Sequence, residues 1–229
     1  MSTSSSSGEI NSDLKYLMTI LMSQTLAMRP EDLSGFCHSF FDKIEACSHV
    51  VGQSFSTITK CRLNRRAFVR MCMSAFEQFP PSSLMTTFDH AILIRALCPN
   101  IATTLLHEIH FLITPLGKDQ TRSYSVQDLN SGLYFVILFE GFLAAIKNMY
   151  GTDGDSKPSY INVSVLGNKF EELRIEKECL YEFPSPAAIR SVINDIETSF
   201  GSDAEVSYDT LRRTFVSNSY IRDELILIS

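Results

Sequence analysis

Apolar residues near the start of the chain recur with the period of a helix. Between residues 13 and 27 they are Leu14, Leu17, Met18, Ile20, Leu21, Met22 and Leu26. At about 100° per residue these positions cover more than half of the helix circumference. A surface helix needs an apolar stripe only roughly 100° wide, so this pattern predicts two partners, a neighbouring helix and something else.

A second helix is predicted to start near Pro30, because proline suits the first helical position. Its apolar residues form one face and are Leu33, Phe36, Cys37, Phe40, Phe41 and Ile44. The short connection 27–29 predicts an antiparallel hairpin. A hairpin of ~32 residues is too small to be stable alone. We therefore expect it to dimerise into an antiparallel four-helix bundle through Leu17, Leu21, Leu26, Leu33, Phe36 and Phe40.

The expected bundle leaves a groove between the two first helices. An amphipathic helix from another protein would fit there, against Ile10, Leu14, Met18 and Met22. Methionine side chains adapt their shape, which favours a surface that accepts varied partners.

Residues 13–44, which run from Asp13-Leu14-Lys15-Tyr16 through Pro30-Glu31-Asp32-Leu33-Ser34-Gly35-Phe36 to Phe40-Phe41-Asp42-Lys43-Ile44, resemble a known family. They are similar, without gaps, to the RIIa dimerisation and docking domain of the type II regulatory subunit of cAMP-dependent protein kinase. The resemblance implies a homodimeric bundle that binds the amphipathic helix of A-kinase anchoring proteins. The family often has an Ile-Pro-Pro-Gly-like lead-in, whereas this chain has Ile10-Asn11-Ser12-Asp13.

The chain is too short for cyclic-nucleotide domains and shows no phosphate-binding cassette. Its C-terminal stretch 189–218 is similar to the C-terminus of ropporin, so the chain resembles the ropporin and radial-spoke class of flagellar proteins. That resemblance implies an axonemal adaptor in a cilium or flagellum. Its partners would be an anchoring scaffold, a second copy or a related RIIa protein, and other radial-spoke subunits.

The remaining chain is predicted to be mainly helical. We expect a disordered N-terminus over 1–12, the RIIa-like domain over 13–47, a linker over 48–63 and a helical domain over 64–229. Within that domain, helices are predicted over 64–78, 83–97, 101–112, 126–150, 185–199 and 207–217. The chain shows no internal repeat, and the β-prone stretch from Tyr160 to Leu166 has no obvious partner strand.

Composition narrows the class of protein further. The formal charge of −6 argues against nucleic-acid and membrane-surface binding. The apolar run Leu133–Ile146 is shorter than the ~20 residues of a membrane span. The polar N-terminus predicts no secretory signal, so the six cysteines are expected to be reduced thiols in the cytoplasm.

Several weaker signals favour simple structural interpretations. Residues 199–211 resemble a degenerate EF-hand loop, but with Val206 in the eighth position the twelfth is Thr210, where calcium needs a glutamate. The acidic loop 151–155 has Pro158 where such a site needs its invariant glycine, and no glutamate closes it. The two histidines of His107-Glu108-Ile109-His110 are three apart, not four as in the zinc helix.

Two further clusters of residues also favour structural interpretations. Cys37 and His38 are adjacent in sequence and point about 100° apart on a helix, so they do not pair. Arg62, Arg65, Arg66 and Arg70 form a basic cluster that predicts a solvated helix face or, alternatively, a contact with acidic surfaces such as tubulin tails.

The sequence therefore predicts a docking adaptor that is not an enzyme and uses no cofactor or metal. The alternative is a calcium-responsive regulator derived from the EF-hand, and a thiol or metal enzyme is a third possibility.

Overall fold

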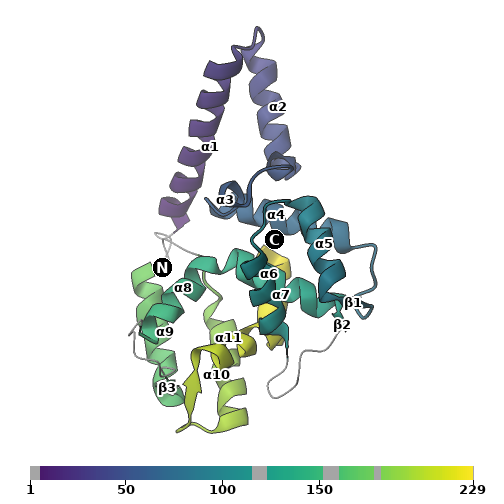
Figure 1. The fold of residues 1–229 in the computed structure, drawn as a ribbon. Coiled ribbons are helices and arrows are strands. Elements are labelled where there is room, and N and C mark those ends of the chain that lie inside the picture. The colour runs from purple at the N-terminus through teal and green to yellow at the C-terminus, as the bar shows by residue number, and fades with distance from the viewer. Residues whose placement is uncertain (1–5, 115–122, 152–159, 178–181, 229) are drawn as a thin grey trace.

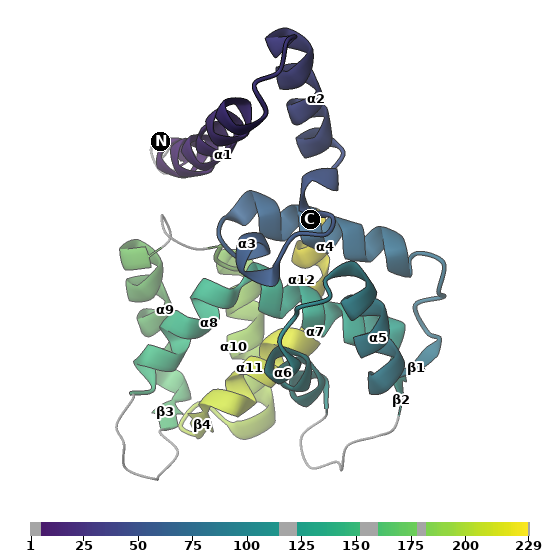
Figure 2. The ribbon, with the colours of Figure 1, turned by 45° about the horizontal axis from the view of Figure 1, so that its top comes forward.

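The computed structural model describes residues 6–114, 123–151, 160–177 and 182–228, with side chains described from residue 13 onward in the first range. It is mainly helical, as predicted. An N-terminal helical hairpin projects from a larger helical body, and both ribbon views show the two parts clearly (Figures 1 and 2).

The hairpin consists of α1 (Ser6–Met28) and α2 (Leu33–Glu45). Its turn holds Arg29 at a φ of 44°, and Asp32 caps α2 by accepting a 2.9 Å hydrogen bond from the amide of Gly35. The prediction of disorder over 1–12 is wrong for residues 6–12, which are helical. They contain no proline that would interrupt the helix.

The segment expected to be a linker, 48–63, is folded. It contains the 3-10 helix η1 (Ser48–Val50) and the short helix α3 (Phe55–Ile58). Val50 and Ile58 are fully buried in the body core. The segment between the hairpin and the body is therefore packed against the body, because its two buried apolar residues anchor it there although the stretch has no helical period.

The body repeats one unit four times: a helix, a short strand and a second helix that starts at the end of the strand. The units are α4 (Arg62–Phe76), β1 (Leu84–Thr86) and α5 (Thr87–Leu97); α6 (Thr103–Ile113), β2 (Ser123–Ser125) and α7 (Val126–Leu138); α8 (Glu140–Met149), β3 (Tyr160–Asn162) and α9 (Val163–Lys177); and α10 (Pro186–Phe200), β4 (Glu205–Ser207) and α11 (Tyr208–Ser217). A final helix, α12 (Ser219–Ile228), packs against α7, α10 and α11. The expectation of no internal repeat was wrong.

The strands join the units in pairs. β1 pairs antiparallel with β2, with Met85 opposite Tyr124, and β3 pairs antiparallel with β4, with Ile161 opposite Val206. The β-prone stretch at Tyr160 therefore does have a partner, 45 residues later at Glu205–Ser207. In each strand a buried apolar residue is followed at once by a residue that can cap the next helix.

These caps explain why the helices start where they do. Thr86, Ser125 and Ser207 accept hydrogen bonds from the backbone amides three residues later, at 3.0–3.1 Å. The predicted helix 83–97 is therefore a strand followed by a helix, because the cap residue itself has an extended backbone.

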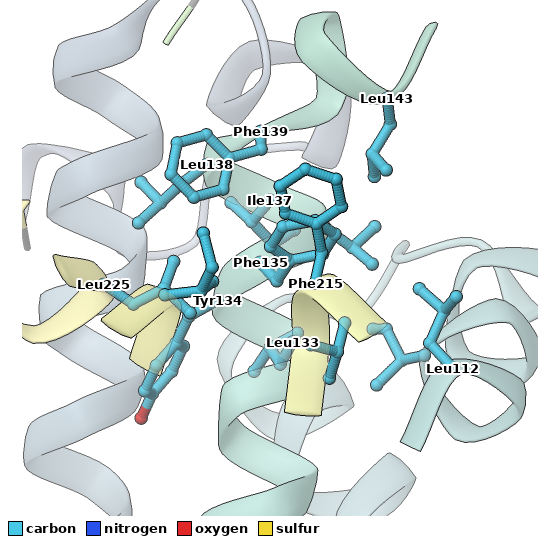
Figure 3. Packing of buried hydrophobic residues seen from close by; sticks show 14 of the residues in the cluster. Leu112, Leu133, Tyr134, Phe135, Ile137, Leu138, Phe139, Leu143, Phe215 and Leu225 are labelled. Atoms are coloured by element: carbon cyan, nitrogen blue, oxygen red, sulfur yellow. The ribbon is translucent and has the colours of Figure 1, made fainter. Parts of the chain in front are cut away.

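The predicted helix 126–150 is two helices, α7 and α8, bent by 76° at Phe139. Ten of the thirteen residues of α7 are buried, so this helix is the centre of the core (Figure 3). Phe142 of α8 lies between the rings of Phe139, Phe170, Phe183 and Phe215, with centroids 5.2–6.2 Å apart. The bend places the apolar residues of both helices against several neighbours.

Candidate docking surface

The outer face of α1 carries an apolar stripe. Its described residues, four apart, are Leu14, Met18, Met22 and Leu26, which are 50%, 41%, 61% and 73% exposed. Ile10 continues the same spacing in α1, but its side chain lies outside the described part of the chain. Soluble proteins rarely leave such a stripe uncovered unless it binds something. The stripe contains the predicted docking residues.

The inner face of α1 is covered within the same chain. Leu17 and Leu21 are each only 7% exposed, and Phe36 and Phe40 of α2 are half-buried. The two helices diverge from the turn, and a cavity of about 460 Å³ lies between them and the body. The predicted dimerisation residues therefore fall into two groups, because Leu17 and Leu21 point inward while Leu26 and Leu33 are exposed.

A buried polar residue of α4 connects α1 to the body. Asn64 is 2% exposed, donates to the carbonyl of Thr57 at 2.9 Å and lies 3.2 Å from Nε2 of His49. It also shares a hydrogen bond with the side chain of Tyr16. Burial raises the pKa of the Tyr16 hydroxyl, so the group stays neutral in this contact. The angle of α1 is thus fixed by polar contacts as well as by packing.

The arginine cluster makes contacts inside the chain. Arg66 lies 2.5 Å and Arg62 4.0 Å from the carboxylate of Glu182, which is 8% exposed. Arg65 lies 3.3 Å from Glu140 and donates to the carbonyl of Thr59 at 2.6 Å. The prediction of a solvated face is wrong for Arg62 and Arg65, whose side chains are each 15% exposed, whereas the Arg66 side chain is 43% exposed and Arg70 is exposed. Sequence could not reveal this, because the main carboxylate is more than 100 residues away.

The same cluster surrounds the start of α1. Burial raises the pKa of Asp13, and the nearby guanidinium groups of Arg62 and Arg66 partly offset that rise. Asp13 also accepts a hydrogen bond from the backbone of Arg62. The base of the hairpin is therefore held against α4 by charge as well as by Tyr16.

A histidine pair lies in the body, away from the hairpin. His90 of α5 is completely buried, and its Nδ1 lies 3.5 Å from Nε2 of His110. Burial lowers the pKa of His90 to about 3 and that of His110 to about 4. His107 is exposed and His110 is half-buried. No sequence pattern connects His90 to this pair, because it comes from another helix.

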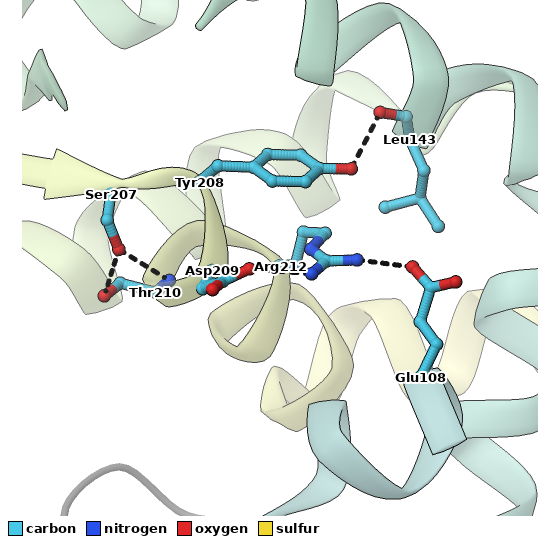
Figure 4. A network of polar contacts seen from close by, with 7 residues as sticks. All are labelled: Glu108, Leu143, Ser207, Tyr208, Asp209, Thr210 and Arg212. Carbon is cyan, nitrogen blue, oxygen red and sulfur yellow. Dashed lines mark hydrogen bonds and ion pairs between the residues drawn. The ribbon is translucent and has the colours of Figure 1, made fainter. Parts of the chain in front are cut away.

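Arg212 of α11 connects three helices of the body. Its guanidinium forms an ion pair with Glu108 of α6, lies 2.7 Å from Asp209 and stacks 4.3 Å from the ring centre of Tyr208 (Figure 4). The Tyr208 hydroxyl donates to the carbonyl of Leu143 in α8 at 3.1 Å. Glu108 lies between His107 and His110 in the sequence, and its carboxylate pairs with Arg212 in this network.

Residues 199–211, whose sequence resembles a degenerate EF-hand loop, lie in the unit formed by α10, β4 and α11. Four residues, 201–204, connect α10 to β4. At the twelfth loop position, the Thr210 hydroxyl lies 3.0 Å from the cap hydroxyl of Ser207. The matching residues in the first two units, Asp89 and Asp128, accept hydrogen bonds from their cap hydroxyls at 2.6–2.7 Å. Most of the acidic loop 151–155 lies outside the described residues.

Other chemistry is sparse in the part of the chain that the structure describes. That part holds no group of three or more His, Cys, Asp or Glu side chains placed to share a metal ion. Its five cysteines are free thiols, and His38 lies 3.7 Å from Asp42. No single helix in these ranges is long and apolar enough to cross a bilayer, although α7 and α8 reach that length and composition as a bent pair.

No family model, curated protein or solved structure matches the chain.

Proposed function

We propose that the chain is a docking adaptor without enzymatic activity, whose hairpin dimerises and binds the amphipathic helix of an anchoring-type scaffold protein. One observation supports this most strongly. The described side chains of Leu14, Met18, Met22 and Leu26 form an exposed apolar stripe along a helix that projects from the body. Its residues are four apart along one side of α1, so they form the kind of apolar helix face with which helices recognise one another.

In this proposal different surfaces of the hairpin bind the scaffold helix and the second copy. Leu14, Met18 and Met22 of the stripe bind the scaffold helix, and a second copy covers the exposed apolar residues at the turn and on α2. Those are Leu26, Leu33 and the edges of Phe36 and Phe40. Leu17 and Leu21 hold α1 against α2 within each chain. The second copy is either the same protein or a related RIIa protein.

The cellular setting of the proposal rests on the resemblance to the ropporin and radial-spoke class. It places the protein in the axoneme of a cilium or flagellum, where the helical body would attach the hairpin to a larger assembly such as a radial spoke.

The decisive experiment measures mass and peptide binding together. Light scattering should give a dimer of twice 25.8 kDa that binds a synthetic anchoring-protein helix. The double variant Leu14→Glu, Met18→Glu should remain a dimer and lose the peptide, because two carboxylates cannot be buried without partners. The control Ser23→Glu places one carboxylate on α1 outside the stripe and should bind normally. A wild-type monomer that ignores the peptide would refute the proposal.

A calcium-responsive regulator is the alternative, and the four helix–strand–helix units favour it. The side chains at the twelfth loop positions disfavour it, because Asp89, Asp128 and Thr210 are already hydrogen-bonded to the cap hydroxyls of their helices. Calorimetric titration separates the two functions: saturable heat at micromolar calcium supports a sensor, and no heat at millimolar calcium eliminates one.

A further inference from the structure

A second groove lies on the body, between α4, α7 and α12. Its volume is about 720 Å³, within the range of roughly 300–1,000 Å³ of ligand pockets. Apolar side chains line most of it: Met73 and Phe76 from α4, Val126 and Tyr134 from α7, and Leu225 and Ile226 from α12. The groove is a separate surface from the stripe on α1, since no stripe residue lines it.

One side of the groove is α12, and the contacts of α12 with α7 show how a helix packs on this part of the body. Ile221 and Leu225, four residues apart, are 0% and 1% exposed. Arg222 lies 2.8 Å from Asp128, the residue that also accepts the cap hydrogen bond of α7. One short amphipathic helix of the chain itself therefore packs beside α7 through an i, i+4 pair and one ion pair. The groove is the continuation of this surface toward α4.

Four charged residues line the groove, and two of them, Arg222 and Asp223, come from α12. The other two, Arg70 of α4 and Glu77 at the C-cap of that helix, are exposed and opposite in sign. They are seven residues apart, so they lie on the same side of the helix at a separation of about 10 Å. A helix lying along α4 would meet a cation at one end and an anion two turns later.

We propose that this groove is a second docking site, which binds an amphipathic helix of a partner protein. The partner helix carries an apolar i, i+3, i+4, i+7 seam, with an acidic residue beside Arg70 and a basic residue beside Glu77. With the hairpin at one end and this groove on the body, one chain joins two helical partners. The proposal does not depend on the function proposed for the hairpin, because the two surfaces share no residue.

Two synthetic helices test the charge pattern. Each peptide has leucines at i, i+3, i+4 and i+7 and one glutamate and one lysine seven residues apart. In one peptide the glutamate comes first in the sequence, and in the other the lysine comes first. Fluorescence anisotropy with the full chain should show that one order binds at least about tenfold more tightly, a difference of about 1.4 kcal/mol. The variant Arg70→Glu, Glu77→Arg should reverse the preference. Equal binding of both peptides by both proteins would overturn the charge assignment.

A pair of matched variants tests the location. Ser74→Trp places an indole from α4 in the groove and should weaken the better peptide at least about tenfold. Ser202→Trp adds the same side chain at an exposed turn and should have no effect. Failure of any peptide to bind, or loss of binding in Leu14→Glu, Met18→Glu instead, refutes the site. Tight one-to-one binding of anilinonaphthalene sulfonate that no peptide displaces would assign the groove to a small molecule and likewise refute the proposal.

Discussion

The hairpin and the body use similar amounts of apolar sequence in opposite ways. In the body, Phe135, Phe142 and Phe215 are completely buried, and the Phe215 ring stacks on Phe135 and meets Phe142 edge to face. In α1, Met22 and Leu26 are more than half exposed. Large apolar side chains thus stabilise the fold in one region and remain exposed in the other.

This contrast has an energetic meaning. Burying a large apolar side chain stabilises a protein by about 1.5–3 kcal/mol, and the body has already gained this energy within one chain. The stripe of α1 gains it only when another molecule arrives. A substitution therefore tells the regions apart by what it weakens: the free energy of unfolding in the body, or binding in the hairpin.

The largest expected effect is a matched truncation in the two regions. Phe142→Ala should lower the free energy of unfolding by about 3–5 kcal/mol, because it empties a site between four rings. Met22→Ala should change it by less than about 0.5 kcal/mol. Urea unfolding of both variants measures the difference. Equal losses would mean that α1 is part of the core.

The next effect concerns Arg212, which links α6 to α11. Arg212→Ala should cost about 2 kcal/mol, below the ~3–5 of a fully buried pair, because Glu108 and Asp209 are partly exposed and can rehydrate. Arg190→Ala, at an exposed position of α10, should change stability by less than about 0.5 kcal/mol. Equal unfolding midpoints for the two variants would contradict the linking role of Arg212.

A pH titration should reveal the His90–His110 pair. Burial lowers both pKa values, to about 3 and about 4, whereas unfolded histidine titrates near 6.5. Below pH 6.5 these two histidines bind protons in the unfolded chain but stay neutral in the folded chain. The free energy of unfolding therefore decreases as the pH falls from 7 toward 3. His90 alone should remove about 2 kcal/mol between pH 7 and pH 5.

The variant His90→Gln supplies the control for this pH dependence. It cannot take up that proton, so unfolding at pH 7 and pH 5 should differ less in the variant than in the wild type. Carboxyl groups with raised pKa, such as Glu224, act in both proteins and cancel in the comparison. An unchanged pH slope would show that His90 is not the group responsible.

The smallest effect tests the contact between the two regions. Tyr16→Phe removes the hydrogen bond to Asn64 and should cost about 0.5–1 kcal/mol, confined to α1. Amide exchange in α1 should become faster while α7 is unchanged. Tyr220→Phe, at an exposed site on α12, should leave both helices unaffected. Faster exchange throughout the body would mean that the two regions unfold together.

Sequence reasoning succeeded where one segment alone determines the outcome. The 3.6-residue period located the hairpin and most body helices, and the cap residues were present in the sequence. It failed where the partner lies far away: Glu205–Ser207 for the strand at Tyr160, Glu182 for the arginines and His110 for His90. The repeat was missed because an apolar residue followed by a cap, as in Met85-Thr86 and Val206-Ser207, is a weak signal that only its pairing makes visible.

The ion pair between Arg66 and Glu182 also sets an order of events during synthesis. The two residues are 116 positions apart, so at about 5–20 residues per second the carboxylate is added roughly 6–23 s after the arginine. The hairpin and α4 are therefore synthesised well before the carboxylate that pairs with Arg62 and Arg66. A nascent chain presents the stripe of α1 before the helical body that carries the hairpin is complete.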